Sequence, residues 1–255
     1  MTDNRSRCLS GIDTSVGRGL EIGALDRPLL PWSPGRIFTA DHSSTEALRE
    51  KYAHDPAVSK VDIRAVDFDL SRMPLTRAAQ SAGFDYVVAS HVIEHVPDLV
   101  GWLGEIETIL NVGGRLALAI PDRRFTFDYF RRETTLWMVQ EAIGRKRPDA
   151  ETVLDFMVNV VAADAGLLWA DPGSQRDMKK LVSADTCNEL MARHAGGEYI
   201  DVHCWVFTPE SFSTLIMEII KKNRLQFQLT FLEPTSSNQL EFYAQLTKVR
   251  PNGFL

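Results

Sequence analysis

Short apolar runs alternate with amphipathic runs along the first half of the chain. Residues 98–110 place their apolar side chains on one helical face, and residues 44–53 have helical propensity. Runs typical of strands lie between and around these segments, at residues 19–23, 35–41, 61–69, 84–90 and 115–121. Because strands that alternate with helices pair in parallel through right-handed crossovers, the pattern predicts a doubly wound α/β sheet whose ligand lies at the carboxyl ends of the strands.

Local signals mark the ends of the two helices. Ser43 and Glu46 have the spacing of a capping box, so we expect the first helix to begin there. The glycines of "NVGG", residues 111–114, are expected to stop the second helix.

The alternation ends after Pro121. Residues 123–201 show helical spacing without a convincing strand, and no linker composition flanks them. We therefore expect one domain over residues 1–255. Its core would comprise residues 14–122 and 202–250, and the helical insertion would lie over the strand ends and hold the acceptor.

The C-terminal part returns to the sheet. Thr208 and Pro209 predict the N-cap and the first residue of a helix. Two strand-like runs follow, at residues 225–234 and 239–249, and a short turn joins them. They predict a terminal antiparallel pair, which brings the sheet to seven strands that are otherwise parallel.

Composition excludes several classes of protein. The net charge of −6 disfavours a general nucleic-acid-binding surface, because such binding needs an excess of Lys and Arg. The polar N-terminus has no apolar segment of a signal peptide, and no apolar run approaches the roughly 20 residues of a membrane span. The three cysteines, Cys8, Cys187 and Cys204, have no metal-binding spacing and are expected to be reduced thiols in a cytoplasmic protein.

Candidate ligand chemistry begins at the first strand. Glu21 ends that strand and Gly23 follows it, and a glycine lets backbone N–H groups approach a ligand closely. Asp41 ends the second strand 20 residues later, where a carboxylate can accept hydrogen bonds from ribose hydroxyls. Each residue also has a plainer interpretation, since Gly23 can simply make a turn and Asp41 can cap a helix.

The next two strand ends add further polar groups. Asp67 and Phe68 are expected at the end of the third strand, where a carboxylate and an aromatic ring suit an adenine edge and face. An exposed acid beside a core phenylalanine explains them almost as well. Ser90 and His91 fall at the carboxyl end of the fourth strand, near the expected centre of the sheet.

The segment "HVIEH" brings two histidines to an i, i+4 spacing. His91 and His95 could then serve as metal ligands on one helical face. In the zinc signature, however, the glutamate follows the first histidine directly, whereas Glu94 precedes the second one. We therefore expect no metal site.

The ordered segments "LEIGALDRP", "TADH", "VDFD" and "FDYVVASHVIEHVPDLVGWLGEIETILNVGGRLALAIPD" resemble the motifs of class I S-adenosylmethionine-dependent methyltransferases, which have a Rossmann-like fold. The resemblance spans roughly residues 17–122. More weakly, "GALDRP", "ASHVIEHVPD" and "IPDRRFTFDYFR" are similar to bacterial methyltransferases of surface-polysaccharide and natural-product pathways.

The resemblance implies a role for each matched position, with S-adenosylmethionine as cofactor. The implied contacts are Glu21, Gly23 and Ala24 to the methionine and ribose, Asp41 with His42 to the ribose hydroxyls, Asp67 and Phe68 to adenine, and Ser90 and His91 beneath the methionine. The sequence departs from the family pattern at the first loop, where Leu25 and Arg27 replace the second and third glycines.

If a hydroxyl group receives the methyl group, a nearby side chain would need to accept the proton of that hydroxyl. The candidates are His91, Asp122 and His203, although each can equally have a structural role, as a cofactor shelf, a loop acid and a buried hydrogen-bonded histidine. Arginines and aromatics in "DRRFTFDYFRR" suit a phosphate, a carboxylate or a sugar ring, or else form a solvated face over the core.

We therefore predict a metal-independent methyl transfer to a small-molecule or carbohydrate-like acceptor, most simply at oxygen. Two other functions stay open. A nicotinamide-dependent oxidoreductase shares the ribose acid and the sheet pattern but would carry GxGxxG, and a catalytically silent cofactor-binding scaffold would explain the glycine-poor loop. Nothing in the sequence indicates an oligomeric state.

Overall fold

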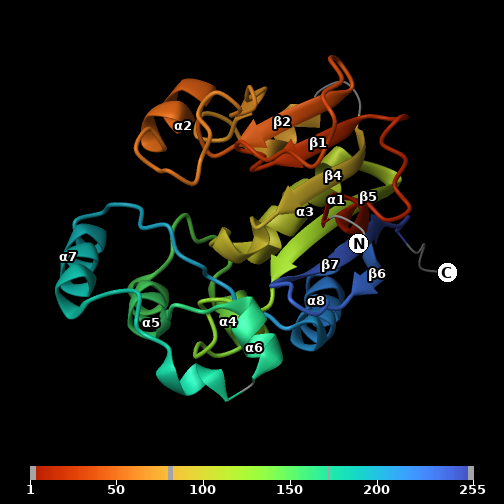
Figure 1. Ribbon diagram of the computed structural model, residues 1–255. Coiled ribbons are helices and arrows are strands. Elements are labelled where there is room, and N and C mark those ends of the chain that lie inside the picture. Colours follow the sequence, from red (N-terminus) through yellow and green to blue (C-terminus); the bar gives the residue numbers. More distant parts are fainter. Residues whose placement is uncertain (1–3, 80–82, 172, 252–255) are drawn as a thin grey trace.

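The computed structural model describes residues 4–79, 83–171 and 173–251, which form a seven-stranded sheet flanked by helices (Figure 1). The strand order is β3-β2-β1-β4-β5-β7-β6. Strands β1 to β5 pair in parallel, whereas β7 pairs antiparallel with both β5 and β6. The predicted fold class, a doubly wound and mostly parallel sheet with an antiparallel C-terminal pair, is confirmed.

The strands are β1 (Gly19–Ile22), β2 (Ile37–Asp41), β3 (Phe68–Asp69), β4 (Phe84–Ser90), β5 (Leu110–Pro121), β6 (Phe227–Glu233) and β7 (Glu241–Lys248). The α-helices are α1 (Asn4–Cys8), α2 (Thr45–Lys51), α3 (Leu99–Ile109), α4 (Leu136–Glu141), α5 (Ala150–Asn159), α6 (Ala165–Ala170), α7 (Ala184–Ala195) and α8 (Pro209–Asn223). The 3₁₀ turns are η1 (Leu75–Ala79), η2 (Ile93–His95), η3 (Arg123–Phe125) and η4 (Ser174–Asp177).

The central strands are buried on both faces. Val87 and Val88 of β4 are both 0% exposed, yet they belong to different clusters because successive side chains point to opposite sides of a strand. The larger cluster contains the apolar faces of α3 and α8, and the smaller one contains Cys8 of α1. This double coverage explains why β4 is an almost continuous apolar run.

Helices α4 to α7 lie between β5 and α8 in the chain and beyond the carboxyl ends of β4 and β5 in space (Figure 1). Helices α5 and α7 share a small core, which includes Val153 and Met157 of α5, whereas Val139 of α4 belongs to the larger cluster. In the described part of the chain between β5 and α8, the strand-like pairing consists of two isolated bridges, Asp122 with Phe207 and Val161 with Lys180.

The third predicted strand is largely wrong. Of residues 61–69 only Phe68 and Asp69 form β3. Asp67 N–H still donates to the Thr39 carbonyl of β2 at 2.9 Å, but before it Arg64 N–H donates to the Leu25 carbonyl and Val66 N–H donates to Thr45 Oγ1, both at 2.8 Å and both outside the sheet. These loop contacts replace the ladder that the apolar pattern indicates.

Two helix boundaries also differ from the prediction. Helix α2 has Ser44 rather than Ser43 as its N-cap, with Ser44 accepting a hydrogen bond from Ala47 N–H. Helix α3 ends at Ile109 because Leu110 is already extended and pairs with Phe84 of β4. The "NVGG" glycines therefore do not stop the helix but lie at the register shift inside β5.

The predicted start of α8 is confirmed, with Thr208 as N-cap and Pro209 in the first turn. No helix in the described part of the chain combines the length and the apolarity that a membrane crossing requires.

Candidate functional site

Three of the predicted ligand positions meet at the carboxyl edge of the sheet. In the register, Ile22 of β1 lies between Ala40 of β2 and Ala89 of β4. Gly23 therefore leaves the sheet between Asp41 and Ser90. This is the edge at which ligands of doubly wound sheets bind.

The loop after β1 has the backbone of a glycine-rich turn with few glycines. Gly23 has a φ of 71°, and a Cβ at this position would lie 2.7 Å from Val92 Cγ2. Leu25 has a φ of 43°, so it adopts the left-handed conformation where the family pattern places its second glycine. The loop therefore has a left-handed residue at this position although the residue is not glycine.

Glu21 stabilises this loop through hydrogen bonds to the residues at its far end. Its buried carboxylate accepts hydrogen bonds from Leu29 N–H at 2.6 Å and Leu30 N–H at 2.9 Å. Burial raises the pKa of Glu21, while the two backbone donors act against that shift. The structure therefore gives Glu21 internal partners that hold the returning chain. Ala24, in the loop after β1, is also buried.

Asp41 and His42 form a close pair at the end of β2. The buried Asp41 carboxylate accepts a hydrogen bond from His42 N–H at 2.7 Å and lies 2.6 Å from His42 Nδ1. The His42 side chain is exposed, with Nε2 3.2 Å from Lys51 Nζ. An oriented carboxylate at this edge fits a ligand with vicinal hydroxyls.

Asp67 and Phe68 are not at the strand end that the sequence suggested. Asp67 precedes β3, and its carboxylate accepts a hydrogen bond from Thr39 N–H at 2.8 Å. Phe68 packs against Phe38, with ring centroids 5.9 Å apart. The acid that ends β3 is Asp69, which pairs with Asp41 in the register.

His91 leaves β4 in the left-handed conformation, with a φ of 52°. Its Nε2 lies 2.5 Å from Glu241 Oε2, and its Nδ1 lies 3.5 Å from Glu94 Oε1. Burial disfavours the imidazolium, but the contacts with Glu241 and Glu94 outweigh it and raise the pKa of His91 to about 10. Because both ring nitrogens face carboxylates, His91 is unsuited to accept a proton from a substrate.

Asp122 is fully buried at the end of β5. Its carboxylate forms an ion pair with Arg124 at 2.7 Å and accepts a hydrogen bond from the Thr235 hydroxyl at 2.7 Å. These contacts hold η3 against the chain before β7, so Asp122 acts as a structural acid here and not as a free base.

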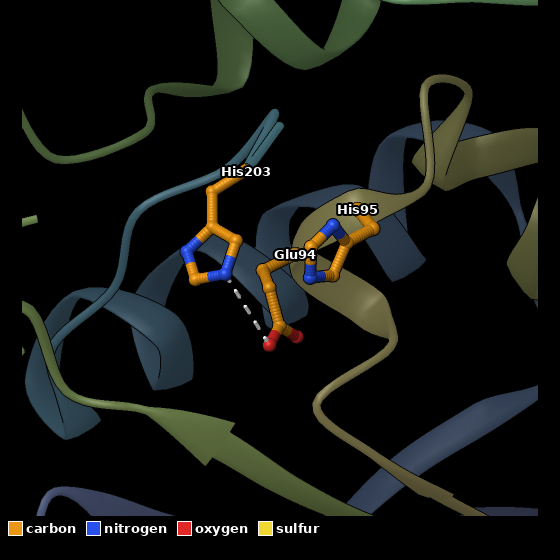
Figure 2. A group of neighbouring side chains, drawn as sticks. All are labelled: Glu94, His95 and His203. Carbon is orange, nitrogen blue, oxygen red and sulfur yellow. Dashed lines mark ion pairs between the residues drawn. The ribbon is translucent and has the colours of Figure 1, made fainter. Parts of the chain in front are cut away.

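His203 is buried on the segment that leads back from α7 to α8. Its Nδ1 lies 2.6 Å from Asp128 Oδ2, and its Nε2 lies 3.9 Å from Glu94 Oε1 (Figure 2). Burial opposes ionisation of Asp128, but contact with His203 and Arg131 lowers the pKa of this carboxyl. Of the three proposed bases, His91 and His203 both contact carboxylates and line the cavity described next, whereas Asp122 is not part of its lining.

That cavity has a volume of about 460 Å³ and lies where the helical segment meets the carboxyl ends of β4 and β5. Its polar wall contains His91, Glu94, His95 and His203. Its apolar wall comes mainly from the segment between β5 and α8: Phe125, Phe127, Val161, Ala162, Ala163, Ala165 and Leu181. The motif "HVIEH" was the sequence signal for Glu94 and His95, whereas nothing in the sequence linked them to His203.

Two arginines of the segment after β5, Arg124 and Arg131, form ion pairs within the chain. Arg131 pairs with Asp128 and Asp155, both at 2.8 Å, and Arg124 pairs with Asp122. Phe125 stacks on Trp169, with centroids 4.2 Å apart. This favours the packing interpretation for these residues, although a second cavity of about 500 Å³ borders Arg124 and the stacked rings.

A family model described as a methyltransferase domain matches residues 1–216. No curated protein matches the chain. A solved structure from Rhodobacter sphaeroides, named as a zinc-dependent alcohol dehydrogenase, is similar in fold alone, with 15% identity and a TM-score of 0.51 over 98% of this chain and 92% of that one.

Two further solved structures are similar at lower TM-scores. One is an S-adenosylmethionine-dependent methyltransferase from Thermotoga maritima, with 14% identity and a TM-score of 0.42 over 96% of this chain and 86% of that one. The other is magnesium protoporphyrin IX methyltransferase from Synechocystis PCC 6803, with 9% identity and a TM-score of 0.40 over 96% of this chain and 80% of that one.

Proposed function

This chain belongs to the methyltransferase-domain family, and from that premise we propose that it uses S-adenosylmethionine to methylate an oxygen atom of a small-molecule or carbohydrate-like acceptor. The observation behind the proposal is the position of the cavity of about 460 Å³, which adjoins the carboxyl ends of β4 and β5. Its volume suits a small molecule or a sugar residue.

The cofactor side of the site would use the edge formed by β1, β2 and β4. When bound, S-adenosylmethionine supplies a methyl group on a positively charged sulfur. Gly23 offers close backbone approach, and Asp41 offers a buried carboxylate to ribose hydroxyls. Ser90 and His91 would lie between this edge and the cavity, because His91 follows β4 and also lines the cavity.

The acceptor side would use the cavity wall. In-line transfer needs mainly alignment and exclusion of water, and the apolar wall from the segment between β5 and α8 provides both. A reacting hydroxyl must also lose its proton, and the groups that face the cavity for this task are Glu94, His95 and His203. Asp122, which is bonded to Arg124 and Thr235, has no part in this proposal.

Titration calorimetry tests the cofactor first. S-adenosylmethionine and S-adenosylhomocysteine should bind with one site per chain, and NAD should not bind. A folded protein that binds NAD and neither methionine-derived ligand would contradict the methyltransferase proposal and favour an oxidoreductase.

A second assay separates an enzyme from a scaffold. Formation of S-adenosylhomocysteine is followed with panels of hydroxylated small molecules and saccharides, and the product is located by mass spectrometry. A methyl group on oxygen supports the proposal, and one on nitrogen or carbon would correct the atom. Cofactor binding without turnover on any acceptor would favour the silent scaffold.

A further inference from the structure

Three metal-ligating side chains from two distant parts of the chain converge on the polar wall of the cavity. Glu94 and His95 come from η2 and His203 from the segment before α8, and one ligand atom of each lies within 4.8 Å of the others (Figure 2). Main-chain bonds fix this junction, since Cys204 N–H and Trp205 N–H donate to the Glu94 carbonyl at 2.6 and 3.1 Å.

Glu94 is the least satisfied member of this cluster. Its side chain is 0% exposed, and neither carboxylate oxygen has a hydrogen-bond partner among the residues that the structure describes. Its two ion-pair contacts are long, because Nδ1 of His91 lies 3.5 Å and Nε2 of His203 lies 3.9 Å from Glu94 Oε1. A buried carboxylate without hydrogen bonds is costly unless a cation binds it directly.

The two histidines are oriented as metal ligands usually are. His95 Nδ1 lies 2.9 Å from Asp201 Oδ1, and His203 Nδ1 lies 2.6 Å from Asp128 Oδ2. A carboxylate on Nδ1 fixes the ring and leaves Nε2 for an ion. Asp201 and Asp128 therefore each leave Nε2 of the histidine that they contact free for an ion.

We propose that Glu94, His95 and His203 bind one divalent transition-metal ion, for which zinc is the best match, on the wall of the acceptor cavity. Two imidazoles and one carboxylate form a donor set that suits zinc, whereas magnesium and calcium prefer oxygen ligands. Ligand atoms around a tetrahedral zinc ion lie about 3.4 Å apart, so the ligand atoms, which lie within 4.8 Å of one another, need to approach by at most about 1.4 Å. This proposal replaces the expected metal-independent reaction.

An ion held by three protein ligands keeps a fourth position open towards the cavity. An acceptor hydroxyl in that position would have a lowered pKa and would release its proton to water. This second part rests on the proposed function, whereas metal binding itself does not.

The test uses the full chain after removal of metal with a chelator. Calorimetry should show one Zn²⁺ site per chain and at least about 100-fold weaker binding of Mg²⁺. Glu94→Gln and His203→Gln should each weaken Zn²⁺ binding at least about 100-fold. Glu218→Gln and His54→Gln, which change exposed residues of the same types, should leave it unchanged.

Co²⁺ gives a measurement that does not depend on the folding of a variant. The stripped wild-type chain should take up one Co²⁺ and show the visible absorption of a four-coordinate site, and Zn²⁺ should displace it. A folded wild-type chain that binds neither ion would overturn the proposal, and so would undiminished Zn²⁺ binding by a folded Glu94→Gln variant.

S-adenosylmethionine calorimetry on the same stripped protein separates the two proposals. Cofactor binding without Zn²⁺ binding would overturn only the metal site. Zn²⁺ binding without cofactor binding would support the metal site and overturn the proposed function.

Discussion

At the scale of single residues, Leu25 shows how the first loop keeps its shape. A left-handed conformation costs a residue other than glycine roughly 1–2 kcal/mol, and Leu25 adopts it with a φ of 43°. The loop therefore stores strain that a glycine would release.

Comparison of Leu25→Gly with Leu25→Ala isolates this strain, because both variants remove the side chain beyond Cβ. The glycine variant should be the more stable by about 1 kcal/mol, as measured by urea unfolding. At Leu154, an exposed residue within α5, the glycine variant should instead be less stable than the alanine variant by about 0.5–1 kcal/mol. The same order at both positions would mean that Leu25 is unstrained.

The proposed contact between Asp41 and the cofactor ribose can be tested by substitution. Asp41→Asn should weaken S-adenosylmethionine binding by about 10- to 100-fold, because charge-assisted hydrogen bonds to the ribose are lost. Asp185→Asn, on exposed α7, should leave the affinity unchanged. Unaltered affinity in the Asp41 variant would show that the ribose binds elsewhere.

The three cysteine thiols differ in their exposure to solvent. Cys8 is fully buried, and burial raises the pKa of its thiol well above the usual range, with Glu241 and Glu21 adding to the shift. Cys204 is buried too, whereas Cys187 is partly exposed. Ellman's reagent at pH 8 should therefore label Cys187 first in the native chain and label all three after unfolding. Rapid native labelling of Cys8 would contradict its placement under the sheet.

At the scale of elements, α8 is anchored by local chemistry. Thr208 accepts a hydrogen bond from Ser211 N–H, and the Ser211 hydroxyl accepts one from Thr208 N–H. Thr208→Ala should lower the free energy of unfolding by about 1 kcal/mol in urea. Thr214→Ala, in the exposed middle of the same helix, should lower it less. An equal loss in both variants would mean that the cap contributes nothing.

Local signals of this kind made α8 and α3 predictable. The signals failed where partners are distant in sequence. Residues 61–67 look like a strand, but Arg64 and Val66 bond to the loop after β1 and to α2. Likewise α3 ends where Leu110 finds Phe84, and that pairing depends on the sheet register.

At the scale of the whole molecule, the sequence predicted the seven-stranded sheet and the edge at which Gly23, Asp41 and Ser90 meet. Alternation of strands and helices predicts parallel pairing, and parallel pairing brings the carboxyl ends of the strands to one edge. The polar wall of the cavity was not predictable in the same way. It depends on Glu94 lying near His203 and on His91 lying 2.5 Å from Glu241 across 150 positions of the chain, and no periodicity encodes such contacts.

The place of β7 has a consequence for how the protein is made. This strand lies between β5 and β6, and its first residue, Glu241, is the partner of His91. A nascent chain that has left the ribosome up to α8 therefore contains the five parallel strands β1 to β5, but β5 has an exposed edge and His91 lacks its Glu241 partner. Chaperones would meet that edge in cells, and the site becomes complete only after the C-terminal hairpin has been synthesised and has docked.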